Sequence, residues 1–364
     1  MREESSRHSV VRVGTLLLGL LLALRGPRAE AYPIAPMTLW ELTLEAELIV
    51  WAEVEAVTSR ITDSDEDPWL SGIEESTARL RVIEVWKGTA HPDERVEVAY
   101  SPSVLCPAPP RYAQGLLVVA FLSRWQGTWS TVGLSYGTRY PTNNDEAQAY
   151  RRVVELAVKA QSKASPRVPY REDEQALASA PVDWEVLAAS HPATRWDGLF
   201  RLVPTGDVVR DFYVEGVDRS VRLSPEQRET LARGFVAHPP LDRSLPMLLL
   251  PLRGHASAEV DVAAARALET VLLESGPSRW ALLAFDLLRE RHGEPLVARV
   301  IPEADGIKRA WESAQPGGVD ARSKAVLSLP EEWRRFKQRR RLTPRPLPLP
   351  VEPPVAGVGG ETPL

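Results

Sequence analysis

The stretch LIVWAEVEAVT at residues 48–58 decides how the first half of the chain folds. Every second residue up to Ala56 is apolar, whereas Glu53 and Glu55 occupy alternate positions. Successive side chains of a strand point to opposite faces, so this alternation predicts a strand with one buried face. A short helix over residues 38–46 is expected to precede it.

Four more segments have strand character. The segment 78–86 breaks its alternation near Ile83, which predicts a β-bulge, and the segment 116–122 is continuously apolar, as in a central strand. Five strands within about a hundred residues are typical of a small closed barrel. The four segments are residues 78–86, 95–100, 116–122 and 129–134.

One pattern of motifs extends across this region. VIEVWKG at residues 82–88 is followed by a strand, by Cys106 in a proline-rich loop, and by GLLVVAFL at residues 115–122. Over residues 38–160 the pattern resembles exported bacterial domains similar to netrin modules and tissue inhibitors of metalloproteinases. The resemblance implies a five-stranded OB barrel flanked by helices. It does not imply protease inhibition, because those inhibitors chelate zinc with an N-terminal cysteine, which this chain lacks.

The second half of the chain has helical patterns. Asn143 with Glu146 three residues later predicts a helix start, as does Ser224 followed by Pro225. Apolar stripes then predict two helices that form an antiparallel hairpin, over residues 257–275 and 278–292. A helical-repeat array is an open alternative, although no repeating period is found in the sequence.

The predicted fold class is α+β, with an N-terminal five-stranded OB-like β-barrel and flanking helices, then a mainly α-helical domain and a disordered proline-rich tail. Seven basic residues gather between Arg334 and Arg345, and proline dominates from Thr343 onward. The tail is interpreted as solvated, with docking to an anionic surface or to a proline-reading partner as alternatives. The expected segments are a signal peptide (1–31), the barrel domain with its C-terminal helix (32–161), a linker (162–180), the helical domain (181–330) and the tail (331–364).

The first residues predict export. Three arginines precede an uncharged run at residues 13–24, which is shorter than the roughly 20 residues needed to cross a bilayer. The box AEA at residues 29–31 then suits signal peptidase, so cleavage after Ala31 is expected to leave Tyr32 as the first residue. An uncleaved anchor is the alternative. The predicted location is secreted or periplasmic, with no transmembrane segment after cleavage.

Composition narrows the function classes. The net charge is −5, and −7 without the first 31 residues, which hold five arginines and three glutamates. This mild acidity predicts no nucleic-acid partner. The single cysteine, Cys106, excludes a disulfide within one chain. Its thiol is interpreted as buried, with an intermolecular bridge or a nucleophile as alternatives.

One loop has ligand spacing for calcium. Asp63, Asp65, Asp67 and Glu74 fall at positions 1, 3, 5 and 12 of a calcium loop. Position 6 normally turns sharply at glycine, whereas Pro68 is confined to negative φ, and no helices are expected on either side. A solvated acidic loop is the competing interpretation. No cofactor other than calcium is expected from the sequence.

A hydrolase-like motif and the histidines suggest no catalytic or metal site. GLSYG at residues 133–137 matches the nucleophile elbow around Ser135, but the elbow needs a strand that feeds a helix, and a turn with two glycines is expected instead. No metal-ligand spacing connects the histidines that follow the signal segment, which are His91, His191, His238, His255 and His292.

Tryptophans in or beside the predicted strands offer an aromatic face of the kind that OB barrels use for oligosaccharides. Packing in the core and at its rim is the alternative. The residues are Trp51, Trp86, Trp125 and Trp129.

The sequence therefore predicts an exported, non-enzymatic binding or interaction protein that uses the barrel and the helical domain. The expected partner is a protein or a glycan in the cell envelope or outside the cell. The reason is that few titratable groups gather as an enzyme site would require. The alternatives are an exported hydrolase with an unrecognised site and a structural component of the envelope.

Overall fold

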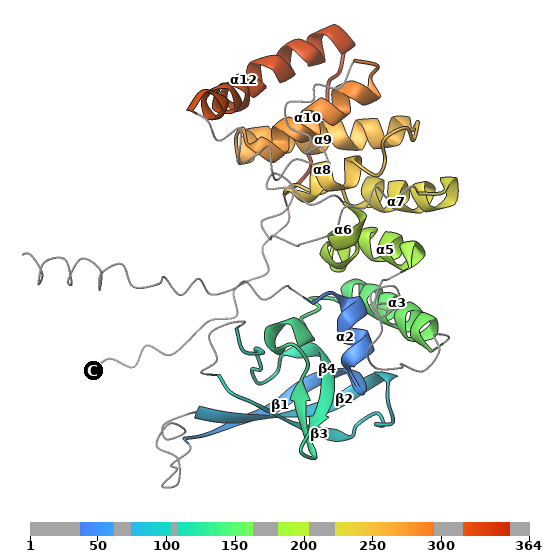
Figure 1. Cartoon of the computed structure of the whole chain (residues 1–364), viewed down its shortest axis with the longest axis vertical. Helices are drawn as coiled ribbons and strands as arrows, with labels where there is room; N and C mark the ends of the chain where they lie inside the picture. The colour runs from blue at the N-terminus through green and yellow to red at the C-terminus, as the bar shows by residue number, and fades with distance from the viewer. Residues whose placement is uncertain are drawn as a thin grey trace, which may run out of the picture. The chain divides into compact units, whose positions relative to one another are not determined.

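A computed structural model describes residues 37–61, 74–102, 108–162, 181–203, 223–294 and 316–349. Within these residues the fold is α+β, with a closed five-stranded barrel followed by a helical region (Figure 1). None of the helices in this part of the chain is both long enough and apolar enough to span a membrane. The expected signal peptide, Cys106, nearly all of the linker and residues 350–364 lie outside the described residues.

The barrel has the strand order β1-β2-β3-β5-β4, and β4 pairs back onto β1 to close it. All of these pairs are antiparallel except β3 with β5. A two-residue strand, β6 (Thr138–Arg139), adds to β4. The five barrel strands are β1 (Leu48–Ile61), β2 (Glu74–Lys87), β3 (Arg95–Tyr100), β4 (Leu117–Trp125) and β5 (Thr128–Thr131).

The apolar side chains that alternate along β1 point into the barrel interior. Val50, Ala52 and Val54 are fully buried and pack with apolar side chains of β2, β3 and β4. The predicted bulge in β2 is confirmed, since Trp51 pairs with Glu84 and Ala52 with Val82, which leaves Ile83 unpaired in this ladder. A bulge increases the local twist of a strand and so helps a short sheet to close.

Two helices and the outer side of the barrel share a second core. They are α2 (Leu39–Glu45) and α3 (Asn144–Gln161), and their apolar side chains pack with Phe121 of β4. The predicted start of α3 is confirmed, because the Asn143 side chain accepts from the Glu146 amide at 3.0 Å. Trp184 of the helical region joins this core, so the barrel and the helices are packed together.

The helical region is a stack of helix pairs. Helices α5, α7 and α9 pack one on the next, and α6, α8 and α10 form a second layer that ends against α12 (Figure 1). Each of the three pairs turns at a residue followed by proline, namely His191, His238 and Gly276. The described helices are therefore stacked as in a helical-repeat array, although the sequence shows no repeating period. The helices are α5 (Val182–Ala189), α6 (Arg195–Leu202), α7 (Pro225–Ala237), α8 (Ser244–Leu249), α9 (Ala258–Glu274), α10 (Arg279–Arg291) and α12 (Pro316–Arg340).

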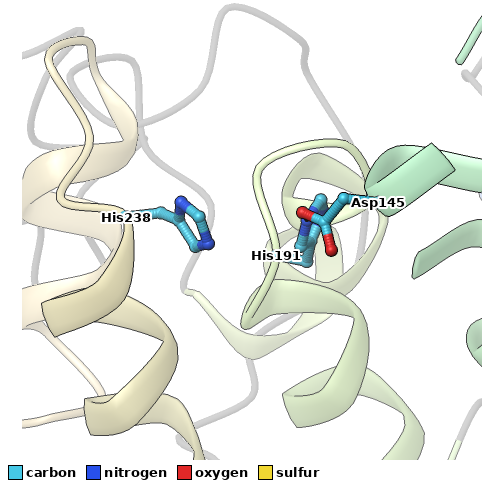
Figure 2. A group of neighbouring side chains, drawn as sticks. All are labelled: Asp145, His191 and His238. Carbon is cyan, nitrogen blue, oxygen red and sulfur yellow. The ribbon is translucent and has the colours of Figure 1, made fainter. Parts of the chain in front are cut away.

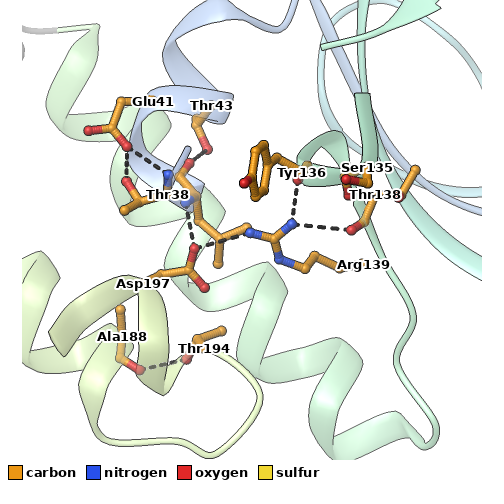
Figure 3. A network of polar contacts seen from close by, with 11 residues as sticks. Thr38, Glu41, Thr43, Ser135, Tyr136, Thr138, Arg139, Ala188, Thr194 and Asp197 are labelled. Atoms are coloured by element: carbon orange, nitrogen blue, oxygen red, sulfur yellow. Dashed lines mark hydrogen bonds and ion pairs between the residues drawn. The ribbon is translucent and has the colours of Figure 1, made fainter. Parts of the chain in front are cut away.

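A buried ion pair connects the barrel helices to the stack. Asp197 of α6 accepts from the Leu39 amide at the start of α2 at 2.8 Å and from the Arg139 guanidinium at 3.2 Å (Figure 3). Burial raises the pKa of Asp197, whereas the charge of Arg139 opposes that shift. The carboxylate also lies at the N-terminus of α2, where a negative charge is favourable.

The expectation of a disordered tail from residue 331 is wrong for residues 331–349. Helix α12 continues to Arg340, and its Trp333 and Phe336 are buried against Phe285 of α10. The chain then lies along α9, where the Leu347 amide donates to Thr270 at 2.7 Å. The physical reason is that two aromatic side chains three residues apart form an apolar stripe within the basic run.

Candidate metal centre

Three side chains from separate helices converge on one point of the described structure. They are Asp145, His191 and His238, and their ligand atoms all lie within 4.8 Å of one another (Figure 2). Asp145 lies in the first turn of α3, His191 follows the C-cap of α5, and His238 is the C-cap residue of α7. The site therefore lies where the last helix of the barrel meets the first two pairs of the stack.

The turn after α5 fixes His191. The Ser190 hydroxyl donates to the carbonyl of Val186 at 2.7 Å. The Thr194 hydroxyl donates to the carbonyl of Ala188 at 2.7 Å, as Figure 3 shows. These bonds satisfy carbonyls at the end of the helix and hold the five-residue turn in one shape. His191 is consequently presented at a defined position on the way from α5 to α6.

The hydrogen bonds of His191 identify its tautomer. The Ala193 amide donates to Nδ1 at 3.2 Å, so the ring proton is on Nε2, which donates to Oδ2 of Asp145 at 3.0 Å. This bond is the main cause that holds the pKa of Asp145 below its ordinary value. The carboxylate is therefore ionised and oriented before any ion arrives.

His238 is held by its backbone rather than by its ring. Buried Arg195 of α6 donates to the His238 carbonyl at 2.7 Å, and burial lowers the pKa of this arginine to about 10. The His238 ring meets the His191 ring edge to face at 5.5 Å. Burial, then the charges of His191 and Arg195, lower the pKa of His238, which favours the neutral imidazole that metals bind.

A cavity of about 330 Å³ surrounds the three groups. Arg152 of α3 and Arg233 of α7 line it together with the cluster. Two histidines and a carboxylate form a ligand set that suits zinc and related transition ions, and three protein ligands leave a coordination position open. Donors bound to one zinc ion lie about 3.4 Å apart, so the side chains would close by up to about 1.4 Å. Asp145 and His238 are exposed and at helix ends, where such movement is inexpensive.

Close approach of the helices makes this convergence possible. A Cβ added to Gly234 of α7 would lie 2.3 Å from the carbonyl oxygen of Ser190. Only glycine allows this contact, which sets His238, one turn along α7, beside His191. Gly198 plays the same part between α6 and α5, where an added Cβ would lie 2.2 Å from the carbonyl oxygen of Glu185.

The predicted calcium loop is not brought into this site. Asp63, Asp65 and Asp67 lie outside the described residues, and Glu74 is the first residue of β2, paired with Ile61 of β1. Calcium at this loop stays a prediction.

The motif around Ser135 does not form a nucleophile elbow. It lies in the 3-10 turn η1 (Leu134–Gly137), which leads into the short strand β6 rather than into a helix. Gly133 has a positive φ of 59°, as expected. Gly137 is needed for a different reason: its backbone lies so close to the Val132 carbonyl oxygen that an added Cβ would be 2.0 Å from it. The turn interpretation of the motif is therefore the better one.

The four barrel tryptophans do not share one face. Trp51 and Trp86 pack in the core under the helices, and Trp129 packs with the barrel interior while Arg124 lies 4.6 Å over its ring. Trp125, at the end of β4, is 71% exposed. Core and rim packing thus describes three of the four.

The cluster of Asp145, His191 and His238 is not predicted by ligand spacing along a single helix, which is the usual sequence signal for a metal site. His191 and His238 instead occupy equivalent positions in consecutive helix pairs, each before a proline that follows the first helix. Equivalent positions of stacked repeats are neighbours in space. The pattern Ala-Ser-His-Pro at residues 189–192 and Val-Ala-His-Pro at residues 236–239 was the available signal.

Comparison of the sequence with models of protein families and with curated proteins found no match.

Proposed function

We propose that the chain is a non-enzymatic binding protein that holds a divalent transition-metal ion at Asp145, His191 and His238, with zinc as the best-suited ion. The observation that carries the proposal is the convergence of these three groups in one open cavity. The ion would join α3 to the ends of α5 and α7 and leave a coordination position for a donor from a partner.

The expected affinity for zinc follows from the hydrogen bond that His191 accepts in the absence of an ion. A zinc ion on Nε2 moves the ring proton to Nδ1, so the hydrogen bond from the Ala193 amide is lost at a cost of roughly 0.5–1.5 kcal/mol. That cost weakens binding by up to about tenfold. We therefore expect a micromolar site rather than the far tighter binding of closed structural zinc sites.

Isothermal titration of the full-length chain with zinc chloride tests this proposal. We expect one site, at least tenfold weaker binding in His238→Ala, and an unchanged affinity in the control His255→Ala. His255 is a suitable control because it also faces a carboxylate, Glu229 at 3.7 Å, but lies outside the cluster. Absence of binding by the wild type, or equal loss in both variants, would refute the metal site.

A metal-dependent hydrolase is the second candidate. It is favoured by the open coordination position and by Arg152 and Arg233, whose charges in the same cavity suit an anionic substrate. Hydrolysis of p-nitrophenyl phosphate by the zinc-loaded chain, lost in Asp145→Asn, would support it. Zinc binding without turnover would favour the binding protein.

Export is part of the proposal. The arginines, the short apolar run and the AEA box at residues 29–31 support a secreted or periplasmic protein that starts at Tyr32. N-terminal sequencing of the protein from the culture medium and envelope fraction decides this point. An exported chain that begins at Met1 would contradict it.

The barrel is proposed to be OB-like and related to the netrin type. The strand order with a parallel β3–β5 contact and a β1–β4 closure supports this assignment. OB barrels bind ligands near the β4–β5 loop, where this chain has the exposed Trp125. A protein or glycan partner is therefore proposed for this end. Sedimentation with purified peptidoglycan, reduced in Trp125→Ala but not in Trp196→Ala, would support a glycan.

A further inference from the structure

A second cavity lies at the C-terminal end of α12, on the last helix of the stack. Its volume is about 510 Å³, and its lining is Arg334, Lys337, Gln338, Arg341, Leu342, Thr343 and Pro344. None of these seven residues carries a negative charge, and three carry a positive charge at neutral pH.

The helix period gathers these side chains. Arg334, Lys337 and Gln338 lie three and four residues apart from the first, so they share one face at the end of α12. Arg341, directly after the helix, lines the same cavity. The chain then reverses at Arg341, which has a φ of 54°, and the Leu342 amide donates to the Lys337 carbonyl at 2.9 Å. This reversal brings Thr343 beside this face of α12, because both line the same cavity.

The cations around the cavity exceed the carboxylates that neutralise them. Lys337 is held by Glu269 at 2.7 Å, and Arg334 pairs with Glu331, which also accepts from Arg335. Arg339 and Arg340 pair with Glu294, whereas no ion pair of Arg341 is found among the described residues. Like charges held together repel one another, and an anion placed among them relieves that repulsion.

We infer that this cavity binds a phosphate group. Guanidinium groups such as those of Arg334 and Arg341 match the geometry of phosphate oxygens, and the ammonium of Lys337 adds a third positive charge to the lining. The Gln338 amide and the Thr343 hydroxyl add neutral donors. The Glu269 contact keeps Lys337 in place, since its side chain is only 24% exposed whereas that of Arg334 is 64% exposed. The phosphate is either that of a soluble diphosphate or the headgroup of an anionic lipid.

Titration of the full-length chain with pyrophosphate, at low ionic strength, is the first test. We expect millimolar or tighter binding that weakens at least fivefold in Arg341→Gln. Arg335→Gln is the matched control, because Arg335 also pairs with Glu331 but does not line the cavity. It should retain wild-type affinity within twofold. Equal weakening in both variants, which is the mark of general charge attraction, would overturn the inference.

Vesicles identify the source of the phosphate. Sedimentation with phosphatidylglycerol vesicles, compared with phosphatidylcholine vesicles, should be reduced by Arg341→Gln and not by Arg335→Gln if the ligand is a lipid headgroup. Pyrophosphate binding without vesicle binding identifies a soluble ligand, and either result supports the cavity. Absence of binding to both probes overturns it. Neither variant changes a residue of the metal cluster.

Discussion

Gly234→Ala is expected to destabilise the protein and to weaken the metal site together. The added Cβ would lie 2.3 Å from the Ser190 carbonyl oxygen and 2.7 Å from the Ser190 Cα, whereas ordinary contacts begin near 3.4 Å. Both obstructing atoms belong to the backbone, so no side-chain rotation can relieve the overlap. Helix α7 must therefore retreat from the end of α5 by about 1 Å.

The magnitude follows from two opposing effects. Overpacking of this kind costs about 1–3 kcal/mol, and the better helix propensity of alanine offsets about 1 kcal/mol of that cost. A net loss of about 1–2 kcal/mol in the free energy of unfolding is expected from urea titration. His238 lies one turn beyond Gly234 and moves with α7. The three ligands must already close on the ion, and the retreat of α7 moves His238 by about another 1 Å beyond that, so zinc affinity should fall at least tenfold.

Gly276→Ala is the matched control for this prediction. Gly276 lies in the turn between α9 and α10 with a φ of 73°, and no atom lies within 4 Å of its added Cβ. Alanine at a left-handed position costs about 1–2 kcal/mol, so both variants lose similar stability. Only Gly234→Ala should lose zinc affinity. A Gly234→Ala protein as stable as the wild type, with unchanged zinc binding, would show that α7 does not approach α5 as described.

Three further predictions address the core and the stack. Asp197→Ala removes one member of a buried ion pair and leaves Arg139 uncompensated, so urea unfolding should show a loss of about 3–5 kcal/mol; a change below 1 kcal/mol would contradict the pairing. Burial lowers the pKa of His292 below 6.5, so its contribution to stability is present above pH 6.5 and is lost as the pH falls toward the folded-state pKa. The pH dependence of the unfolding free energy should flatten in His292→Asn, and an identical slope would exclude this histidine. Gly198→Ala places a Cβ 2.2 Å from the Glu185 carbonyl oxygen, and thermal unfolding should detect a lower Tm, whereas an unchanged Tm would contradict the close helix contact.

The barrel strands could be predicted from the sequence because each one has its own alternation. The third strand matches at both ends, and the others differ by a few residues. The first strand, for example, continues beyond its buried part through Ser59 and Arg60, which still pair with β2. Helix starts at Asn143 and Ser224 were equally readable, because a capping side chain and its amide partner are three residues apart.

The order of residues 331–349, against the expected tail, has a physical reason. This segment is rich in arginine, but whether it packs against the protein depends on the positions of its few apolar side chains. Leu329, Trp333 and Phe336 are spaced by four and three residues, so they occupy one face of α12 and are almost completely buried. The basic residues are then the solvated face of an ordered helix. A long charged run can thus belong to a packed helix when a few large side chains keep the helical period.

The metal cluster could not be found from spacing along the chain, because its geometry depends on how helix pairs stack. The link between Asp145 and His191 already exists without an ion, since Nε2 donates to the carboxylate at 3.0 Å. His238, in contrast, meets His191 only through a ring contact. An ion between the three groups would replace the shared proton of the first pair and add a bond to the third. The main structural effect of the ion would therefore be to fix α7 against α5 and α3. For this reason, displacement of α7 by the methyl group of Gly234→Ala should reduce zinc affinity. Displacement elsewhere in the stack should not.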